Sequence, residues 1–194
     1  MRRKRRARFE DLRTDRLTLR PTTASMGQAL VEAKNRSLPE LRRWMAWAET
    51  DDQSGTLEFA AAAENAWLKG TARTFTIIHE AEVVGSIGLD QVNLMIGSSM
   101  MGYWLRSDLT GRGLMTEAGA ALVAFAFGPA GLHRIELHAA LGNVASIRVA
   151  EKLGFQRRGI LREATYADGA WMDVYSYDLL ETDPPSFLVG SPAR

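Results

Sequence analysis

The sequence predicts a single mixed α/β domain in which helices cover both faces of a central sheet. Three observations support this prediction. The chain has 194 residues, enough for one hydrophobic core but not for two. Apolar residues make up 46% and charged residues 24%, as in ordinary globular proteins. Finally, helical segments come first, a meander of strands follows, and strands then alternate with helices.

The first third of the chain predicts a strand followed by helices. Residues Leu17 to Arg20 alternate and favour a β-strand, which Pro21 stops. Helical patterns follow over residues 22–49, where Thr22 or Thr23 is a candidate cap for one segment and Ser37-Leu38-Pro39-Glu40 opens another. The alanine-rich segment from Ser54 to Lys69 predicts a longer helix, which ends at Gly70.

The middle of the chain predicts a meander. Two β-prone runs, Thr74 to His79 and Val83 to Leu89, are separated by Glu80 and Ala81, which indicates a hairpin. Met100 to Leu105 predicts a further strand.

Strands and helices alternate in the remainder. The sequence predicts a helix from Leu114 to near Gly128, a strand at Ile135–Ala139, a helix at Asn143–Leu153, and closing strands at Phe155–Leu161 and Trp171–Leu179.

Composition excludes several classes of protein. The absence of cysteine excludes disulfide scaffolds, thiolate zinc sites and cysteine nucleophiles. The longest apolar stretch, Ala118 to Phe127, is shorter than the roughly 20 residues that a membrane-spanning helix needs. The basic start runs into Phe9-Glu10-Asp11 instead of an apolar signal region, so we expect a cytoplasmic protein without membrane contact. The three histidines show no ligand spacing, so we expect no metal.

Basic residues are concentrated at the N-terminus, where residues 2–8 contain six of the 24. Without them, 18 basic residues face 23 acidic ones, a net charge of −5. We therefore expect a basic, disordered tail over residues 1–12, a folded domain over 13–182 and a loose tail over 183–194. The basic tail is a solubilising terminus, the result of a misassigned start, or a segment that contacts RNA phosphates; sequence-specific nucleic-acid binding is not expected.

A glycine turn is the first informative motif. A strand that includes Tyr103 runs into a loop with Gly111 and Gly113, and a helix follows directly. The first N–H groups of a helix lack internal partners and lie at the positive end of its dipole, so they suit a pyrophosphate. The turn is not a Rossmann fingerprint, because Thr116 stands where the third glycine is needed, and no Gly-Lys-Ser/Thr of a Walker loop follows.

A second motif, Asn143 to Phe155, follows the strand that contains His133-Arg134-Ile135-Glu136-Leu137. Together with the glycine turn, it resembles the Gcn5-related N-acetyltransferase (GNAT) family, and within it the RimJ/RimL-like branch that acetylates ribosomal proteins. Residues 14–21 and 84–89 also fit this branch, so the resemblance covers residues 13–182. It implies an acetyl-CoA-dependent enzyme with a mixed, mostly antiparallel sheet and splayed strands at the acetyl-CoA site.

The resemblance also implies which residues bind acetyl-CoA. The turn from Asp108 to Gly113 would hold the pyrophosphate, and the strand from Met101 to Leu105 would accept the pantetheine arm. The cofactor-binding residues so implied are Trp104, Leu105, Thr110, Gly111, Arg112, Gly113, Leu114, Met115, Thr116, Asn143 and Ser146. Asp108 departs from the usual Gln or Arg, so we expect it to face solvent or cap the turn. Arg112 either contacts phosphate or is a solvated loop residue.

For catalysis, the family's usual proton donor is a tyrosine seven residues after the asparagine, and here that position is Ala150. Asn143 and Ser146 remain, spaced i, i+3 on one helix face. The resemblance implies that Asn143 touches pantetheine and that Ser146, near the sulfur, is the general acid. The structural alternatives are a helix N-cap for Asn143 and a small packing residue for Ser146.

No general base is defined by the motifs. Glu163 is our first choice, because the branch often has an acid near the substrate there. Glu136 and His138 share one face of their strand and are further candidates, and Glu136 is also a candidate substrate contact. Since a terminal α-amine has a pKa near ~8, a carboxylate acting through water would suffice.

Trp44, Trp47 and Trp67 lie on the early helices, where the family builds its acceptor site. Trp44 and Trp47 are spaced i, i+3 and are candidates to line a pocket for the acceptor; the alternative for all three is core packing.

The reading favoured by the resemblance is direct acetyl transfer, in a ternary complex, to a protein N-terminal α-amine such as that of a ribosomal protein. The alternatives are an acetyltransferase for a small amine (an aminoglycoside, polyamine or amino-acid analogue) and a non-catalytic acyl-CoA-binding sensor. The sequence leaves dimerisation open.

Overall fold

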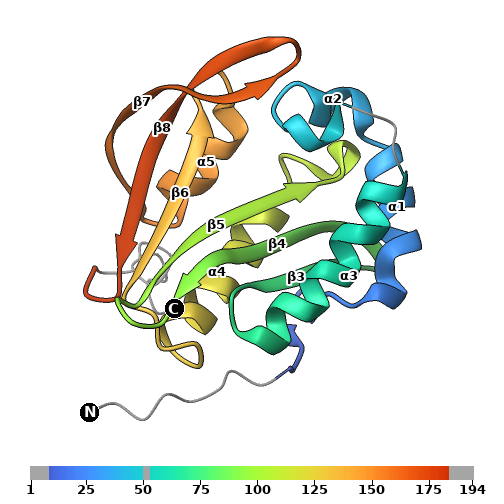
Figure 1. Ribbon diagram of the computed structural model, residues 1–194, viewed down its shortest axis with the longest axis horizontal. Coiled ribbons are helices and arrows are strands. Elements are labelled where there is room, and N and C mark those ends of the chain that lie inside the picture. The colour runs from blue at the N-terminus through green and yellow to red at the C-terminus, as the bar shows by residue number, and fades with distance from the viewer. Residues whose placement is uncertain (1–8, 50–52, 184–194) are drawn as a thin grey trace, which may run out of the picture.

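The computed structural model describes residues 9–49 and 53–183 as one eight-stranded sheet with helices on both faces (Figure 1). The strands are β1 (Leu12–Arg13), β2 (Leu17–Pro21), β3 (Arg73–His79), β4 (Glu82–Asn93), β5 (Ser98–Leu105), β6 (Arg134–Ala140), β7 (Gln156–Ala167) and β8 (Ala170–Leu180). The α-helices are α1 (Gly27–Asn35), α2 (Leu38–Arg42), α3 (Gln53–Lys69), α4 (Leu114–Phe127) and α5 (Val144–Lys152). Short 3-10 turns are η1 (Ala24–Met26), η2 (Ala46–Ala48) and η3 (Ser107–Leu109).

The sheet is mixed but mostly antiparallel, which confirms the predicted fold class. Its strand order is β1-β2-β3-β4-β5-β6-β8-β7, and β5–β6 is the parallel pair. Helices α1–α3 lie on one side of the sheet, whereas α4 and α5 lie on the other (Figure 1). The predicted order of elements is therefore correct.

The two faces of β3 and β4 differ in chemistry, because apolar and small polar residues alternate along both strands. Phe75, Ile77 and Ile87 are fully buried in the main hydrophobic core, which also includes Leu122 of α4. On the opposite face, Thr76 is buried and its hydroxyl lies 3.0 Å from that of Thr22. The apolar face stabilises the fold, and the polar face underlies the cavity described below.

Several local predictions are confirmed, and others need correction. Glu80 and Ala81 form the predicted two-residue hairpin turn, with φ values of 50° and 65°. Strand β7 extends to Ala167 instead of ending at Leu161. It is an edge strand that is exposed along most of its length, and its pairing with β8 stabilises it. Because it has no buried face, its sequence has no apolar alternation from which its length could be predicted.

The folded part begins earlier than the predicted residue 13. The ring of Phe9 packs edge-on against that of Trp67 with centroids 5.1 Å apart, and Leu12 pairs with Leu19. The tail predictions for residues 1–8 and 184–194 lie outside the described residues. Within residues 9–49 and 53–183, a search for a helix long and apolar enough to cross a bilayer finds none.

Candidate active site

The site is built where β5 and β6 separate. Ser98–Met101 of β5 pair in parallel with Arg134–Leu137 of β6. Beyond this point β5 stays paired with β4 as far as Leu105, whereas β6 follows β8. The edge of Gly102–Leu105 that faces β6 therefore has no ladder partner among the residues that the structure describes. Its backbone N–H and C=O groups are free to pair with the amides of a ligand.

A cavity of about 580 Å³ occupies this opening and reaches the helices on the polar side of the sheet. Its lining includes Gly102–Trp104 of β5, Leu137–Ala140 of β6, and Asn143 and Ser146 at the start of α5. Trp44 and Trp47, which the sequence analysis names as candidate acceptor contacts, also line it. The cavity thus brings the predicted donor-side and acceptor-side residues into one space.

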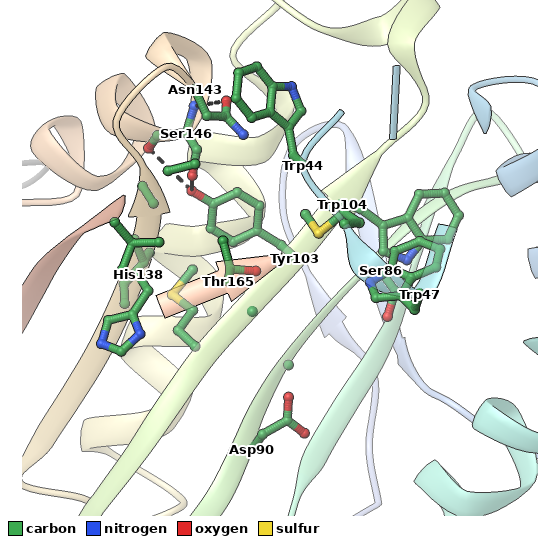
Figure 2. Close-up of a pocket in the computed structure, with 18 of the residues that line it drawn as sticks. Trp44, Trp47, Ser86, Asp90, Tyr103, Trp104, His138, Asn143, Ser146 and Thr165 are labelled. Atoms are coloured by element: carbon green, nitrogen blue, oxygen red, sulfur yellow. Dashed lines mark hydrogen bonds between the residues drawn. The ribbon is translucent and has the colours of Figure 1, made fainter. Parts of the chain in front are cut away.

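Three polar residues are joined at one end of the cavity (Figure 2). The hydroxyl oxygens of Tyr103 and Ser146 lie 2.9 Å apart. The backbone N–H of Ser146 donates to Oδ1 of Asn143 at 3.1 Å, so Asn143 caps α5 and lines the cavity as well. Ala150, at the position of the usual tyrosine, is fully buried. Sequence reasoning missed the pairing of Tyr103 with Ser146, because it joins β5 to α5 across 43 residues.

The indoles of Trp44, Trp47 and Trp104 form a tryptophan wall of the cavity. The rings of Trp47 and Trp104 lie 6.0 Å apart between centroids, and Trp47 is 48% exposed. The Trp44 ring packs against Gly142, where a Cβ would lie only 3.2 Å from it. Trp67 lies elsewhere: it is 5% exposed and packs on Phe75 in the core.

Asp90 of β4 is the one carboxylate among the described lining residues (Figure 2). Burial raises the pKa of this carboxyl above its ordinary value. Its Oδ2 atom faces Gly102, where an added Cβ would lie 3.9 Å away. Sequence reasoning also missed Asp90. Its position on the small, polar face of β4, two residues after Gly88, was the available signal.

The two acids proposed from the sequence lie outside this lining. Glu163 is exposed in a bulge of β7 with φ of 49°, and its backbone N–H donates to Asp173. Glu136 accepts a hydrogen bond from Arg134 at 2.7 Å. Neither is among the residues that line the cavity with Ser146, whereas His138 is. Roles for Glu163 as base and for Glu136 as substrate contact stay predictions.

The glycine turn has the backbone that its sequence predicts. Gly111 and Gly113 have φ values of 75° and 79°, a region that disfavours other residues. Gly113 is the N-cap of α4 and has no side chain with which to cap it, so the first N–H groups of the helix are left for a ligand. Leu114 and Met115 are buried, so they would contact an anion through these N–H groups alone.

Charged side chains of the turn are tied within the protein. Asp108 pairs with Arg106 at 2.7 Å and its side chain is 54% exposed, in agreement with the expectation that it faces solvent. The hydrogen bond from Arg106 lowers the pKa of Asp108. Arg112 donates to the backbone oxygen of Asp108 at 3.0 Å, and the Thr110 hydroxyl donates to the backbone oxygen of Ser107 at 2.8 Å.

Among residues 9–49 and 53–183, no group of three or more His, Asp or Glu side chains is arranged to hold a metal ion.

A splayed sheet, an uncapped glycine turn beside it and a hydroxyl pair at the adjoining helix together define the acetyltransferase class. The acetyltransferase (GNAT) domain model matches residues 16–156, and the chain belongs to the GNAT family. It is an N-acetyltransferase, an acyltransferase whose acetyl donor is acetyl-CoA.

Relatives and solved structures agree with this assignment. The chain is 32% identical over 177 residues to the uncharacterized N-acetyltransferase p20 of Bacillus licheniformis, covering 90% of this chain and 98% of that one. It is 29% identical over 109 residues to the ribosomal-protein-serine acetyltransferase of Escherichia coli, covering 56% and 61%. The fold matches RimL, a ribosomal L7/L12 α-N-protein acetyltransferase solved with coenzyme A, with a TM-score of 0.84, 22% identity and coverage of 90% and 100%.

Proposed function

We propose that this enzyme transfers the acetyl group of acetyl-CoA directly to the α-amine of a protein N-terminus, of the ribosomal-protein type. The observation that carries the proposal is the single cavity that joins the free edge of β5 to the tryptophan wall and Asp90. A donor lying along β5 and an amine entering past Trp47 would meet beside Ser146. A ribosomal acceptor would place the enzyme in the cytoplasm.

The donor would be held mainly by backbone groups. The pyrophosphate accepts hydrogen bonds from the N–H groups at the start of α4, beyond Gly111 and Gly113. The amides of the pantetheine arm pair with the edge of Gly102–Leu105, as an added strand would. This arrangement places the thioester near the start of α5, where Ser146 lies.

In the reaction, the amine nitrogen forms a bond to the acetyl carbon and the carbon–sulfur bond breaks. The nitrogen loses a proton and the leaving sulfur gains one, so that an amide and free CoA result. Asp90 accepts the proton from the amine, directly or through water, and its raised pKa brings it closer to the range useful for a base. The Ser146 hydroxyl stabilises the departing thiolate by hydrogen bonding, and the thiolate then takes its proton from water.

The acceptor class is supported by the relatives and by the cavity. The E. coli relative is named a ribosomal-protein-serine acetyltransferase. Trp47 and Phe59 line the cavity and are both more than 40% exposed, so the rim can contact a chain that continues outward from the reacting amine. The mildly acidic body favours a cationic acceptor.

The test is thiol release from acetyl-CoA at pH 8 with two panels of acceptors. One contains peptides that begin with Ser, Ala, Met or Asp, together with purified ribosomal proteins; the other contains aminoglycosides, polyamines and amino-acid analogues. Acetylation of a polypeptide α-amine, located by mass spectrometry, supports the proposal. Turnover only with small amines, or only at lysine side chains, overturns it in favour of the small-molecule alternative.

A further inference from the structure

We infer that Tyr103 is a positioning residue, which turns the Ser146 hydroxyl toward the sulfur of CoA. The inference rests on the proposed function, because it takes the sulfur to lie beside Ser146. It answers a question that the sequence leaves open. The position of the family's usual tyrosine is Ala150, which is fully buried and has no hydroxyl to contribute.

The geometry pairs these two hydroxyls and gives the tyrosine no competing side-chain partner among the described residues. Tyr103 Oη lies 2.9 Å from Ser146 Oγ and 3.3 Å from the backbone oxygen of the same residue. Both side chains line the cavity (Figure 2). Tyr103 comes from β5 and approaches Ser146 from across the opening between the strands, so the hydroxyl contact spans the proposed thioester site.

The phenol keeps its proton throughout the range in which the enzyme would act. Burial raises the pKa of Tyr103 to about 12, although the hydrogen bond with Ser146 opposes this effect. A neutral phenol has one proton to donate, and the shorter of its two contacts is with Ser146 Oγ. When Tyr103 donates to that oxygen, the hydrogen of Ser146 is free to point at the sulfur.

Without this bond, a serine in the first turns of a helix has another partner. Its hydroxyl can donate back to the carbonyl oxygen three or four residues earlier in the chain, here Asn143 or Gly142. That geometry would direct the hydrogen of Ser146 away from the cavity. When Tyr103 donates to the Ser146 oxygen, the hydrogen of Ser146 is favoured to point into the cavity, where it can donate to the departing thiolate.

The experiment compares Tyr103→Phe, Ser146→Ala and the double variant. Tyr177→Phe is the matched control, because Tyr177 is 1% exposed in the same sheet and its hydroxyl has no hydrogen-bond partner within residues 9–49 and 53–183. We expect Tyr103→Phe to lower kcat about 3- to 10-fold, the scale of one net hydrogen bond, and to leave KM for both substrates within about twofold. In the Ser146→Ala background the same change should have no further effect on kcat.

If Tyr103→Phe lowers kcat by the same factor in the Ser146→Ala background as in the wild type, the inference is overturned, since Tyr103 then acts independently of Ser146. Unchanged kcat in Tyr103→Phe, with kcat lowered in Ser146→Ala, would also overturn it and would leave the proposed function intact.

A second readout needs no acceptor. Calorimetry would compare the affinities of CoA and of a CoA analogue without sulfur at pH 9.

The wild-type protein and Tyr177→Phe should prefer CoA by about 3- to 10-fold, again the scale of one hydrogen bond. Tyr103→Phe and Ser146→Ala should both lose this preference. A preference that is absent from the wild type, or retained in Tyr103→Phe, would overturn the inference whether or not an acceptor has been found. Failure of the acceptor panels with the sulfur preference intact would count against the proposed function alone.

Discussion

Arg16 and Glu117 meet at 2.6 Å between Nη2 and Oε2, which ties the turn between β1 and β2 to the first turn of α4. Arg16 also donates through Nη1 to the backbone oxygen of Arg112 at 3.0 Å, inside the glycine turn. The hydroxyl of Thr14 donates to Glu117 at 2.6 Å. The N-terminal strands therefore support the backbone that would bind pyrophosphate.

We expect Arg16→Ala to raise KM for acetyl-CoA about 3- to 10-fold, because the half-exposed Arg16 supports the turn indirectly, on the scale of one net hydrogen bond of about 0.5–1.5 kcal/mol. The effect on kcat should be small, since Arg16 does not line the cavity. Arg13→Ala is the control, because the Arg13 side chain is 73% exposed and its pair with Asp11 is 3.7 Å long. Steady-state kinetics with varied acetyl-CoA would measure KM and kcat for both variants. Equal KM values for the two variants would contradict the view that Arg16 supports the glycine turn.

The interactions of Glu117 with Thr14 and Arg16 also make the free energy of unfolding depend on pH. Burial alone would raise the pKa of Glu117, but hydrogen bonds from Thr14 and Arg16 outweigh it and lower the pKa below 4.5. The folded state therefore binds this proton less tightly than the unfolded state, so the stabilisation is present above pH 4.5 and is lost as the pH falls through the lower folded value. Urea unfolding from pH 7 to pH 3 should show a smaller decline for Glu117→Gln than for the wild type.

Asp90→Asn should have opposite effects on activity and stability. Loss of the proposed base should lower kcat/KM by about 100-fold, the lower end of what general base catalysis contributes. Because burial raises the pKa of Asp90 in the folded protein, its charged form weakens the fold at neutral pH. The variant should therefore unfold at a higher urea concentration at pH 7. Activity retained at the wild-type level would remove Asp90 from the mechanism.

Gly102 leaves space on the cavity floor that the fold itself does not require. The nearest atom to an added Cβ is Oδ2 of Asp90 at 3.9 Å, and the backbone does not need a glycine there. Gly102→Val should therefore fold normally and obstruct the acceptor, raising its KM at least tenfold, or about 1.4 kcal/mol. Gly159→Val is the control, since an added Cβ at that position of β7 also meets open space. If both variants bind the acceptor like the wild type, Gly102 does not face it.

The tryptophans should separate into two groups. Trp67 packs with Phe75 and Phe125 in the core, so Trp67→Ala should destabilise the fold by about 3–5 kcal/mol. Trp47 is 48% exposed in the cavity wall, so Trp47→Ala should raise the acceptor KM with little effect on the urea midpoint. The reverse result, a stable Trp67→Ala with impaired acceptor binding, would reassign the acceptor site.

The fold could be predicted largely because its elements carry local patterns. Apolar and small polar residues alternate along β3 and β4, which predicts strands without knowledge of the rest of the fold. Gly111 and Gly113 likewise predict a tight turn from the local sequence alone. Strand β7 was predicted too short because it has no buried face, and its length depends on pairing with β8. By contrast, the start of a second helical segment at Ser37-Leu38-Pro39-Glu40 was predicted correctly, since α2 begins at Leu38 with Pro39 in its first turn. The 3-10 turns on either side of α1 and α2 were not predicted.

Site residues that belong to one sequence motif were predicted, whereas those that come together from distant segments of the chain were missed. Asn143 caps the helix that contains Ser146, so the spacing of the two residues allowed both to be placed at one end of that helix, where they line the cavity. Tyr103 was noted only as part of a strand, because its partner is 43 residues away. Asp90 was missed because the base was sought in acids near the C-terminal strands, whereas the cavity floor is formed by β4 and β5.

The unlike faces of the sheet separate two tasks that compete in many enzymes. Residues that hold the protein together, such as Phe75 and Ile87, point to the α4 side, whereas Asp90 and Gly102 border the cavity and add little apolar burial. Changes at these two positions can therefore alter which amine is accepted at small cost in folding free energy. Such a sheet can acquire new substrates by drift in a few small residues, while the opposite face stays fixed by packing.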